Sequence, residues 1–267
     1  ISKEQKIIHQ VPTCYKCKNV IEPLLMDQWF VKMEPLAKEA IKRKINFYPK
    51  RFEKAYLEFL ENIRDWNISR QIVWGIRIPA WQCQNCRKWI VAEGETSRAC
   101  SYCSSSNLKQ DPDTFDTWFS SSQWPFATLM TTKEGDFKEF YPTTVMETGY
   151  DILRWWVARM VMIGIYTTGK VPFENVVLHG LVKDPLGKKM SKSKDNVVNP
   201  LELVDKYGAD SVRFTLVFGT AFGNDQALSY EKLQGMRNFT NKLWNIGRFI
   251  EMSQNQKSKI KNQKSHD

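Results

Sequence analysis

The sequence has no apolar run long enough to cross a membrane. Its best candidate, residues 152–166, is interrupted by Arg154 and Arg159, whereas a spanning helix needs roughly 18 or more apolar residues with few charges. The charged first residues are also not followed by the apolar run and small-residue cleavage site of a signal peptide. We therefore expect a cytoplasmic protein that is neither secreted nor bound to a membrane.

The composition lacks the biases of disordered or collagen-like chains. Hydrophobic residues make up 42% of the 267 residues and charged residues 25%, as in globular domains that bury a core. Lys and Arg outnumber Asp and Glu by 39 to 29, a net charge of +10, which attracts polyanions by counterion release. A nucleic acid is the first partner to consider, and a basic surface that binds nothing is the alternative. Because the chain opens at Ile1 rather than Met, we expect a piece of a longer protein.

The six cysteines fall in three pairs of the same spacing, each with two residues between the thiols. Such turns aim two thiolates at one ion, and two of them supply the four sulfurs of a structural zinc site. We predict this site at Cys83, Cys86, Cys100 and Cys103, free thiols or a redox pair being the alternative. Arg87 and Ser104 stand where glycine often eases such turns. Cys14 and Cys17 would be half of a second site. A closed four-cysteine site has no open position for chemistry, so catalysis must lie elsewhere.

Hydrophobic spacing predicts an α/β fold followed by helices. Apolar residues recur at helical spacing over 51–63 and, more briefly, over 33–44. An extended run at 143–147, a turn at Gly149, a helix from 151 to about 166 and a strand at 175–182 form a βαβ pattern, which is typical of a parallel sheet. Ligands bind such sheets at the carboxyl ends of the strands. We predict further helices at 201–207, 209–218 and 229–252, and we expect the last to face inward with its apolar residues Leu233, Met236, Phe239, Leu243, Ile246 and Ile250.

The most specific string is Lys189-Met190-Ser191-Lys192-Ser193, which follows the strand ending near Val182. Two ammonium groups on a mobile loop suit a reaction in which negative charge builds on a triphosphate while pyrophosphate leaves. A solvated basic loop is the alternative.

This string is identical to the KMSKS signature of class I aminoacyl-tRNA synthetases. Neighbouring segments resemble the valine-specific branch of that family, namely DWNISRQIVWG (65–75), DTWFSSSQWPF (116–126), ETGYDILRWWVARM (147–160), VLHGLV (177–182) and NPLELVDKYGADSVRF (199–214). An isoleucine-specific member would carry Glu-Gly-Ser-Asp-Gln where residues 148–152 read Thr-Gly-Tyr-Asp-Ile, so valine is favoured.

The resemblance implies a four-part organisation. Residues 1–20 would be the exit of an editing-domain insertion, and 21–198 the carboxyl-terminal half of a Rossmann-type catalytic domain, with a zinc ribbon at about 81–110 and the signature loop at 189–193. Residues 199–228 would be stem-contact helices, and 229–267 would begin an anticodon-binding helical bundle that ends in a polar tail. The implied activity is ATP-dependent formation of valyl-adenylate and transfer of valine to tRNA(Val), with ATP, Mg²⁺ and structural Zn²⁺ and a monomeric protein.

The resemblance also assigns site residues. Lys189 and Lys192 would be catalytic. ATP would be bound by His179, Gly180 and the whole signature, Lys189, Met190, Ser191, Lys192 and Ser193. Gly149 and Asp151 would lie by the amino acid and adenylate. Trp118, Ile152 and Trp156 would line the valine pocket, for which core packing is the alternative. Ile152 and Trp156 are four residues apart at the start of the predicted helix, so we expect them to project from one face.

Several departures limit the resemblance. The family's His-Ile-Gly-His signature is absent, and we expect this piece alone not to activate valine. Ile76 stands where the family usually has His, and Asp195 where Gly commonly follows the signature. Two other functions stay open: a non-catalytic, basic zinc-ribbon protein that binds RNA, and a synthetase for isoleucine or another small apolar amino acid.

Overall fold

The structure is a computed structural model that describes residues 9–14, 17–92 and 99–263. The chain forms two compact units. The first, which we call the ribbon unit, contains the described residues up to Lys32 together with Asp65–Asp116. The second, which we call the sheet unit, contains Met33–Arg64 and the described residues from Thr117 onward. In the described part of the chain, no helix is both long and apolar enough to span a bilayer.

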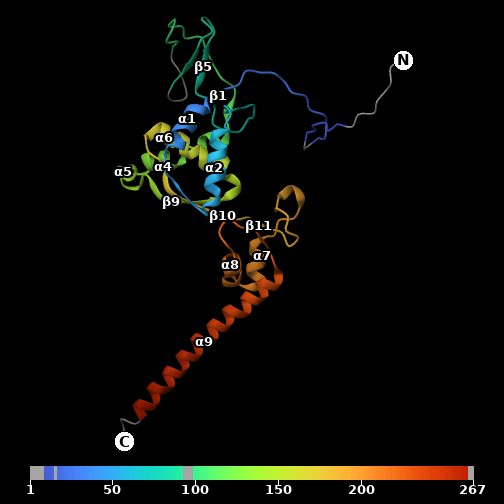
Figure 1. The fold of residues 1–267 in the computed structure, drawn as a ribbon, viewed down its shortest axis with the longest axis vertical. Helices are drawn as coiled ribbons and strands as arrows, with labels where there is room; N and C mark the ends of the chain where they lie inside the picture. Colours follow the sequence, from blue (N-terminus) through green and yellow to red (C-terminus); the bar gives the residue numbers. More distant parts are fainter. Residues whose placement is uncertain (1–8, 15–16, 93–98, 264–267) are drawn as a thin grey trace, which may run out of the picture. The chain divides into compact units, whose positions relative to one another are not determined.

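A three-stranded parallel sheet lies at the centre of the sheet unit (Figure 1). Its order is β2 (Asn46–Tyr48), β10 (Phe173–His179) and β9 (Thr143–Gly149). Both partners run parallel to the central strand β10, in which Val176 and Leu178 are fully buried. The structure thus confirms the predicted parallel α/β fold and its strand at 143–147. The strand predicted at 175–182 is β10, which ends earlier, at His179, and the short β2 was not predicted.

Helices pack beside this sheet. They are α1 (Met33–Ile41), α2 (Arg51–Glu61), α3 (Thr117–Ser121), α4 (Trp124–Thr132), α5 (Asp136–Phe140) and α6 (Ala158–Thr168). Helix α6 is buried over its first eight residues, from Ala158 to Ile165, and it ends at Gly169, whose left-handed φ of 73° suits glycine.

The segment between β9 and α6 differs from the prediction of one α-helix from residue 151. Residues Tyr150–Ile152 form a 3₁₀ turn and Leu153–Val157 a π-helical turn before α6 begins. A π-helical turn holds more residues than an α-helical turn, so it rotates the side chains before it relative to those of α6. Such turns are frequent at functional sites.

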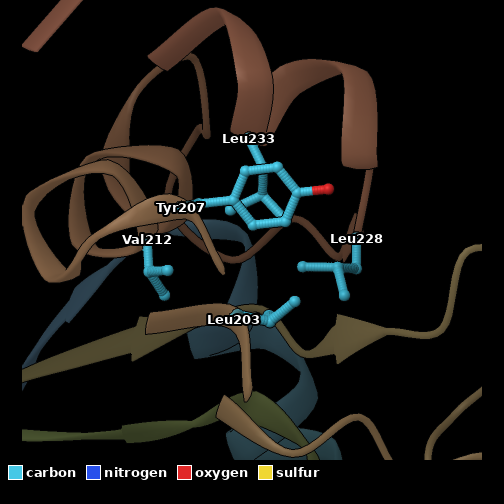
Figure 2. Close-up of a cluster of buried hydrophobic side chains, with 5 residues drawn as sticks. All are labelled: Leu203, Tyr207, Val212, Leu228 and Leu233. Atoms are coloured by element: carbon cyan, nitrogen blue, oxygen red, sulfur yellow. The ribbon is translucent and has the colours of Figure 1, made fainter. Parts of the chain in front are cut away.

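Three further helices follow the signature loop, as predicted: α7 (Pro200–Tyr207), α8 (Ala209–Val217) and α9 (Tyr230–Gln263). Asn199 caps α7 by accepting a hydrogen bond from the Leu201 amide at 3.0 Å. Ser229 caps α9 through the Lys232 amide at 3.1 Å. Figure 2 shows the small hydrophobic core of this region. Buried side chains from the three helices meet there with Leu228, which lies just before α9: Leu203, Tyr207, Val212, Leu228 and Leu233.

Beyond this core, α9 corrects one expectation. The apolar residues Phe239, Leu243, Ile246 and Ile250 were expected to face inward, yet each is more than 40% exposed. Phe239 nevertheless stacks on Phe214 of α8, with ring centroids 5.4 Å apart, so the inward face predicted for α9 is confirmed there and is wrong for Leu243, Ile246 and Ile250. The helix also continues to Gln263 (Figure 1), past residue 252, where the predicted helix ended.

The ribbon unit is built from short antiparallel pairings. Strand β5 (Ala80–Cys83) lies between β6 (Trp89–Val91) and β7 (Leu108–Gln110). Two further pairs are β1 (Phe30–Val31) with β3 (Trp66–Asn67), and β4 (Ser69–Arg70) with β8 (Thr114–Phe115). The buried Asp116 joins these segments, because its carboxylate accepts hydrogen bonds from Trp66 Nε1 at 3.0 Å and Arg70 Nη2 at 2.7 Å.

Candidate functional site

The carboxyl ends of β9 and β10 meet at Gly149 and His179, which pair across the sheet. A side chain at Gly149 would lie 2.8 Å from Asp151 Oδ1 and 3.5 Å from His179 Cε1, so glycine lets both groups approach this edge. His179 Nδ1 donates to the Gly180 carbonyl at 2.7 Å. A cavity of about 370 Å³ opens here, lined by residues 179–182 and by Leu216, Val217, Thr220, Ala221, Phe222, Asn224 and Gln226.

Gly180 allows a second chain segment to pack against the end of β10. A Cβ atom at this position would lie only 1.8 Å from the Asn224 carbonyl oxygen. The close approach brings Asp225 to the strand end, where its Oδ1 accepts a hydrogen bond from the Leu181 amide at 2.8 Å. Glycine at this position is therefore required by the fold of the chain itself.

The Asp225 carboxylate also accepts hydrogen bonds from two side chains of other elements. Its Oδ2 accepts hydrogen bonds from Lys183 Nζ at 2.8 Å and Tyr150 Oη at 3.0 Å. The Lys183 hydrogen bond is the main reason that the pKa of Asp225 is lowered, and the same bond raises the pKa of Lys183. The Asp225 hydrogen bond raises the pKa of Tyr150. The ion pair between Lys183 and Asp225 joins β11 (Val182–Lys183) to the residue before β12 (Gln226–Ala227), and these two strands pair in parallel.

The signature loop places its first lysine at the sheet edge. Lys189 Nζ donates to Asp151 Oδ2 at 2.9 Å, and this hydrogen bond raises the pKa of Lys189. Met190 Sδ accepts the amide of Val198 at 3.5 Å. Ser191 precedes a 3₁₀ turn over Lys192–Lys194, which contains Ser193. Lys192 is exposed. Of the two predicted catalytic lysines, the structure thus brings Lys189 to a predicted substrate-binding carboxylate.

The backbone conformation of Asp195 explains how aspartate can stand where the family commonly has glycine. Its φ is 51°, in the left-handed region that glycine favours and that aspartate tolerates better than most residues. The chain can therefore reverse after Lys194 without the glycine.

The predicted valine-pocket residues lie on adjacent elements. Trp156 is in the π-helical turn, and its Nε1 donates to the Ser121 carbonyl of α3 at 3.2 Å. Trp118 belongs to the same short helix α3. Ile152 ends the 3₁₀ turn, so the expectation that Ile152 and Trp156 share one face of a regular α-helix was wrong. The three side chains are half-buried.

The four cysteines of the ribbon meet as the spacing predicts. Their sulfur atoms all lie within 4.8 Å of one another, with Cys83 to Cys103 at 3.5 Å and Cys86 to Cys100 at 3.6 Å. Two sulfurs on one tetrahedral zinc lie about 3.8 Å apart when each Zn–S bond is about 2.3 Å. The set therefore fits a structural zinc ion. A backbone hydrogen bond from Cys86 is the main cause that lowers the pKa of Cys83 to about 6, whereas the hydrogen bond to Cys83 helps to raise the pKa of Cys103 to about 12.

The turns after the cysteines share one backbone geometry. Arg87 and Ser104 both have a φ of 60°, and their amides donate to the carbonyls of Cys83 and Cys100 at 2.9 and 2.8 Å. Lys18, which follows Cys17, has a φ of 63°, and its amide donates to the Cys14 carbonyl at 2.9 Å. The residue after Cys17 thus has the same conformation and the same hydrogen bond as those after Cys86 and Cys103, and residues 15–16 lie outside the described part.

Sequence reasoning missed the pair Lys183 and Asp225 at the strand ends. It also missed Asp184 and Asn196, whose side chains hydrogen-bond to each other at 2.9 Å on either side of the signature loop. The only signal for Lys183 and Asp184 was their position directly after the predicted strand. No local pattern marks Asp225, because its partner Tyr150 lies 75 residues away. Ile76, the other departure, is exposed, and its carbonyl accepts the Phe115 amide at 2.8 Å.

The structure thus defines an α/β protein with a parallel sheet, a lysine-bearing loop at the carboxyl edge of that sheet and a four-cysteine ribbon. The family model described as tRNA synthetases class I (I, L, M and V) matches residues 9–229. The chain therefore belongs to this family.

Curated relatives are named valine–tRNA ligase. The protein from Clostridium acetobutylicum is 52% identical over 94% of this chain and 29% of its own length. The protein from Dehalococcoides mccartyi strain CBDB1 is 51% identical over 92% of this chain and 28% of its own length. The chain thus spans less than a third of these relatives.

Solved structures agree on the fold. Methionyl-tRNA synthetase of Mycobacterium tuberculosis, in complex with methionyl-adenylate, matches with a TM-score of 0.61 and 20% identity over 85% of this chain and 40% of its own. The LeuRS–tRNA–LeuAMS ternary complex of Agrobacterium radiobacter K84 matches with a TM-score of 0.58 and 25% identity over 68% of this chain and 28% of its own. The fold of a class I synthetase, predicted from the sequence, is confirmed.

Proposed function

We propose that this chain is the carboxyl-terminal part of the catalytic domain of a valine–tRNA ligase and the start of its helical region. The observation that carries the proposal is the signature loop, which brings Lys189 to the carboxyl edge of a parallel sheet, in a chain about half identical to valine–tRNA ligases over nearly all its length.

The proposed reaction begins with valine and ATP, accompanied by Mg²⁺. A carboxylate oxygen of valine attacks the α-phosphorus, the bond between the α-phosphorus and the bridging oxygen breaks, and pyrophosphate leaves with the negative charge. Lys189 and Lys192 stabilise that charge as point cations. Lys189 exchanges its present Asp151 partner at 2.9 Å for phosphate oxygens, whereas the exposed Lys192 needs no such exchange.

The remaining predicted site residues have roles in binding. His179 and Gly180, with Met190, Ser191 and Ser193 of the loop, contact ATP, while Gly149 and Asp151 face the amino acid and adenylate. Trp118, Ile152 and Trp156 form an apolar pocket that limits side-chain size. Discrimination of one methylene in such a pocket is worth about 1–3 kcal/mol, so rejection of close analogues needs an editing step.

The ribbon and the helices have supporting roles. Zn²⁺ bound by Cys83, Cys86, Cys100 and Cys103 would stabilise the ribbon without taking part in the reaction. Cys14 and Cys17 would supply half of a second zinc site. The helices after residue 199 would contact tRNA(Val), a role that the net charge of +10 favours. The residue boundaries of the four segments, a monomeric state and a cytoplasmic location stay predictions from the sequence.

The experiment is Lys192→Ala in a protein that joins this chain to the half of the domain with the histidine signature. We expect valine-dependent ATP–pyrophosphate exchange to fall by about a hundredfold or more. Lys54→Ala, on an exposed face of α2, is the control and should leave exchange unchanged. If the protein only binds RNA, Lys192→Ala will instead lower the salt slope of RNA binding by about one unit, and no exchange will occur.

A further inference from the structure

Asp184 is a buried carboxylate at the base of the signature loop, directly after β11, with 4% of its surface exposed. Its Oδ1 accepts hydrogen bonds from the amides of Leu186 at 3.0 Å and Lys188 at 2.7 Å. Gly187, with a left-handed φ of 76°, closes this turn by donating its amide to the Asp184 carbonyl at 2.8 Å. One carboxylate thus shapes the chain that enters the loop.

Asn196 holds the other end of the loop to the same carboxylate. Its Nδ2 donates to Asp184 Oδ2 at 2.9 Å and to the Lys189 carbonyl at 3.2 Å. Its Oδ1 accepts the Ser191 amide at 2.9 Å. The Asn196 side chain therefore hydrogen-bonds to the backbone on both sides of Met190.

The hydrogen bonds require an acceptor at Asp184 and both a donor and an acceptor at Asn196. Asp184 only accepts in this arrangement, whereas Asn196 must both donate and accept, which an amide does and a carboxylate does not. The Asn196 hydrogen bond is the main cause that lowers the pKa of Asp184, so this carboxylate is ionised at neutral pH. Hydrogen bonds to an ionised acceptor are stronger than neutral ones.

We propose that Asp184 and Asn196 form a clasp that positions Lys189 and Lys192 for the triphosphate. The inference rests on the proposed function, and the two residues act as positioning residues rather than catalytic ones. The clasp fixes the backbone at Lys189 and Ser191, the residues that flank Met190 and precede Lys192. Without it, the two ammonium groups would keep their charge but lose their common placement, and a misplacement of about 1 Å can lower a rate by about a hundredfold.

The decisive variants exchange the two groups. Asn196→Asp sets two carboxylates against each other across a contact of 2.9 Å. The double variant Asp184→Asn with Asn196→Asp restores that hydrogen bond in reverse but still lacks the donor to the Lys189 carbonyl, so its recovery should be partial. The amide introduced at position 184 would donate its Nδ2 to the new carboxylate, while its oxygen still accepts the Leu186 and Lys188 amides. Asn199→Asp is the matched control, because it adds the same charge nearby and aspartate caps α7 as well as asparagine does.

Two readouts follow these variants. The first is trypsin cleavage after Lys192 in the 267-residue chain, with circular dichroism as a check on folding. Because cleavage follows local opening, we expect Asn196→Asp to raise its rate by about tenfold or more, Asn199→Asp to leave it unchanged, and the double variant to return it toward the wild-type rate. The second is ATP–pyrophosphate exchange in the longer protein, where Asn196→Asp should lower kcat/KM for ATP by about a hundredfold while KM for valine stays constant.

The clasp is refuted if Asn196→Asp matches Asn199→Asp in both readouts, or if the double variant is no better than Asn196→Asp. It is also refuted if KM for valine and KM for ATP rise together, since that result indicates general damage. Absence of valine-dependent exchange in the wild-type protein would overturn the proposed function instead, and the cleavage rates would then decide by themselves whether the clasp orders the loop.

Discussion

Gly180→Ala tests how the edge of the sheet is built. The added Cβ would lie 1.8 Å from the Asn224 carbonyl oxygen and 2.1 Å from its carbon, whereas ordinary contacts are 3.4–4 Å. Backbone must therefore move by more than an ångström, and overpacking of this kind costs about 1–3 kcal/mol. The shift also disturbs the Leu181 to Asp225 hydrogen bond, and a hydrogen bond to a charged group contributes about 1.5–3 kcal/mol.

The unfolded chain opposes part of this loss. Replacing glycine with alanine stabilises by about 0.4–1 kcal/mol through the unfolded state, so we expect a net loss of about 1.5–5.5 kcal/mol. Gly235→Ala is the matched control, because this glycine lies inside α9 with nothing within 4 Å of an added Cβ. It should gain about 0.5–1 kcal/mol.

The assay is urea denaturation together with amide hydrogen exchange of β9 and β10. Gly180→Ala should lower the free energy of unfolding and increase exchange in β10, whereas Gly235→Ala should do neither. If Gly180→Ala unfolds at the same urea concentration as Gly235→Ala, or at a higher one, the packing of Asn224 against the strand end is wrong.

Three other changes test separate parts of the account. Leu233→Ala, at a fully buried site, should cost about 2–5 kcal/mol of unfolding free energy, whereas Leu243→Ala, at 53% exposure, should cost less than about 0.5 kcal/mol; equal losses would rule out the core in Figure 2. Chelation of zinc, or Cys83→Ser, should speed hydrogen exchange in β5, β6 and β7 and leave β9 and β10 unchanged, and an unaffected ribbon would exclude structural zinc. Asp151→Asn should lower the pKa of Lys189, whose main raising cause is the Asp151 hydrogen bond, and NMR titration of the lysine side chain showing no change would exclude that pair in solution.

The parts of the fold that the sequence predicts are those with a local signal. Helical spacing identified α2, and consecutive apolar residues identified β10. Strand β2 has three residues, too few for a periodic pattern. The π-helical turn at Leu153–Val157 was missed because its hydrophobic residues read equally well as the start of one α-helix.

The candidate site divides in the same way. The cysteine spacing predicted the sulfur cluster, because a two-residue gap fixes the turn that brings each pair together. The signature string predicted the lysine loop but not its anchors. Asp225 and Asn196 act through tertiary contacts, and neither residue stands in a pattern that marks its partner. The exposed face of α9 was misjudged because apolar spacing indicates that a face can be buried, not that a partner is present.

The most direct test of the central claim is the amino-acid dependence of ATP–pyrophosphate exchange by a protein that joins this chain to the histidine-signature half of its domain. The account predicts exchange that depends on valine and is far slower with isoleucine, and no exchange by the 267-residue chain alone. Equal or faster exchange with isoleucine would contradict the proposal that valine is the substrate. Exchange by the isolated chain would contradict the prediction that the ATP site also needs the half of the domain with the histidine signature.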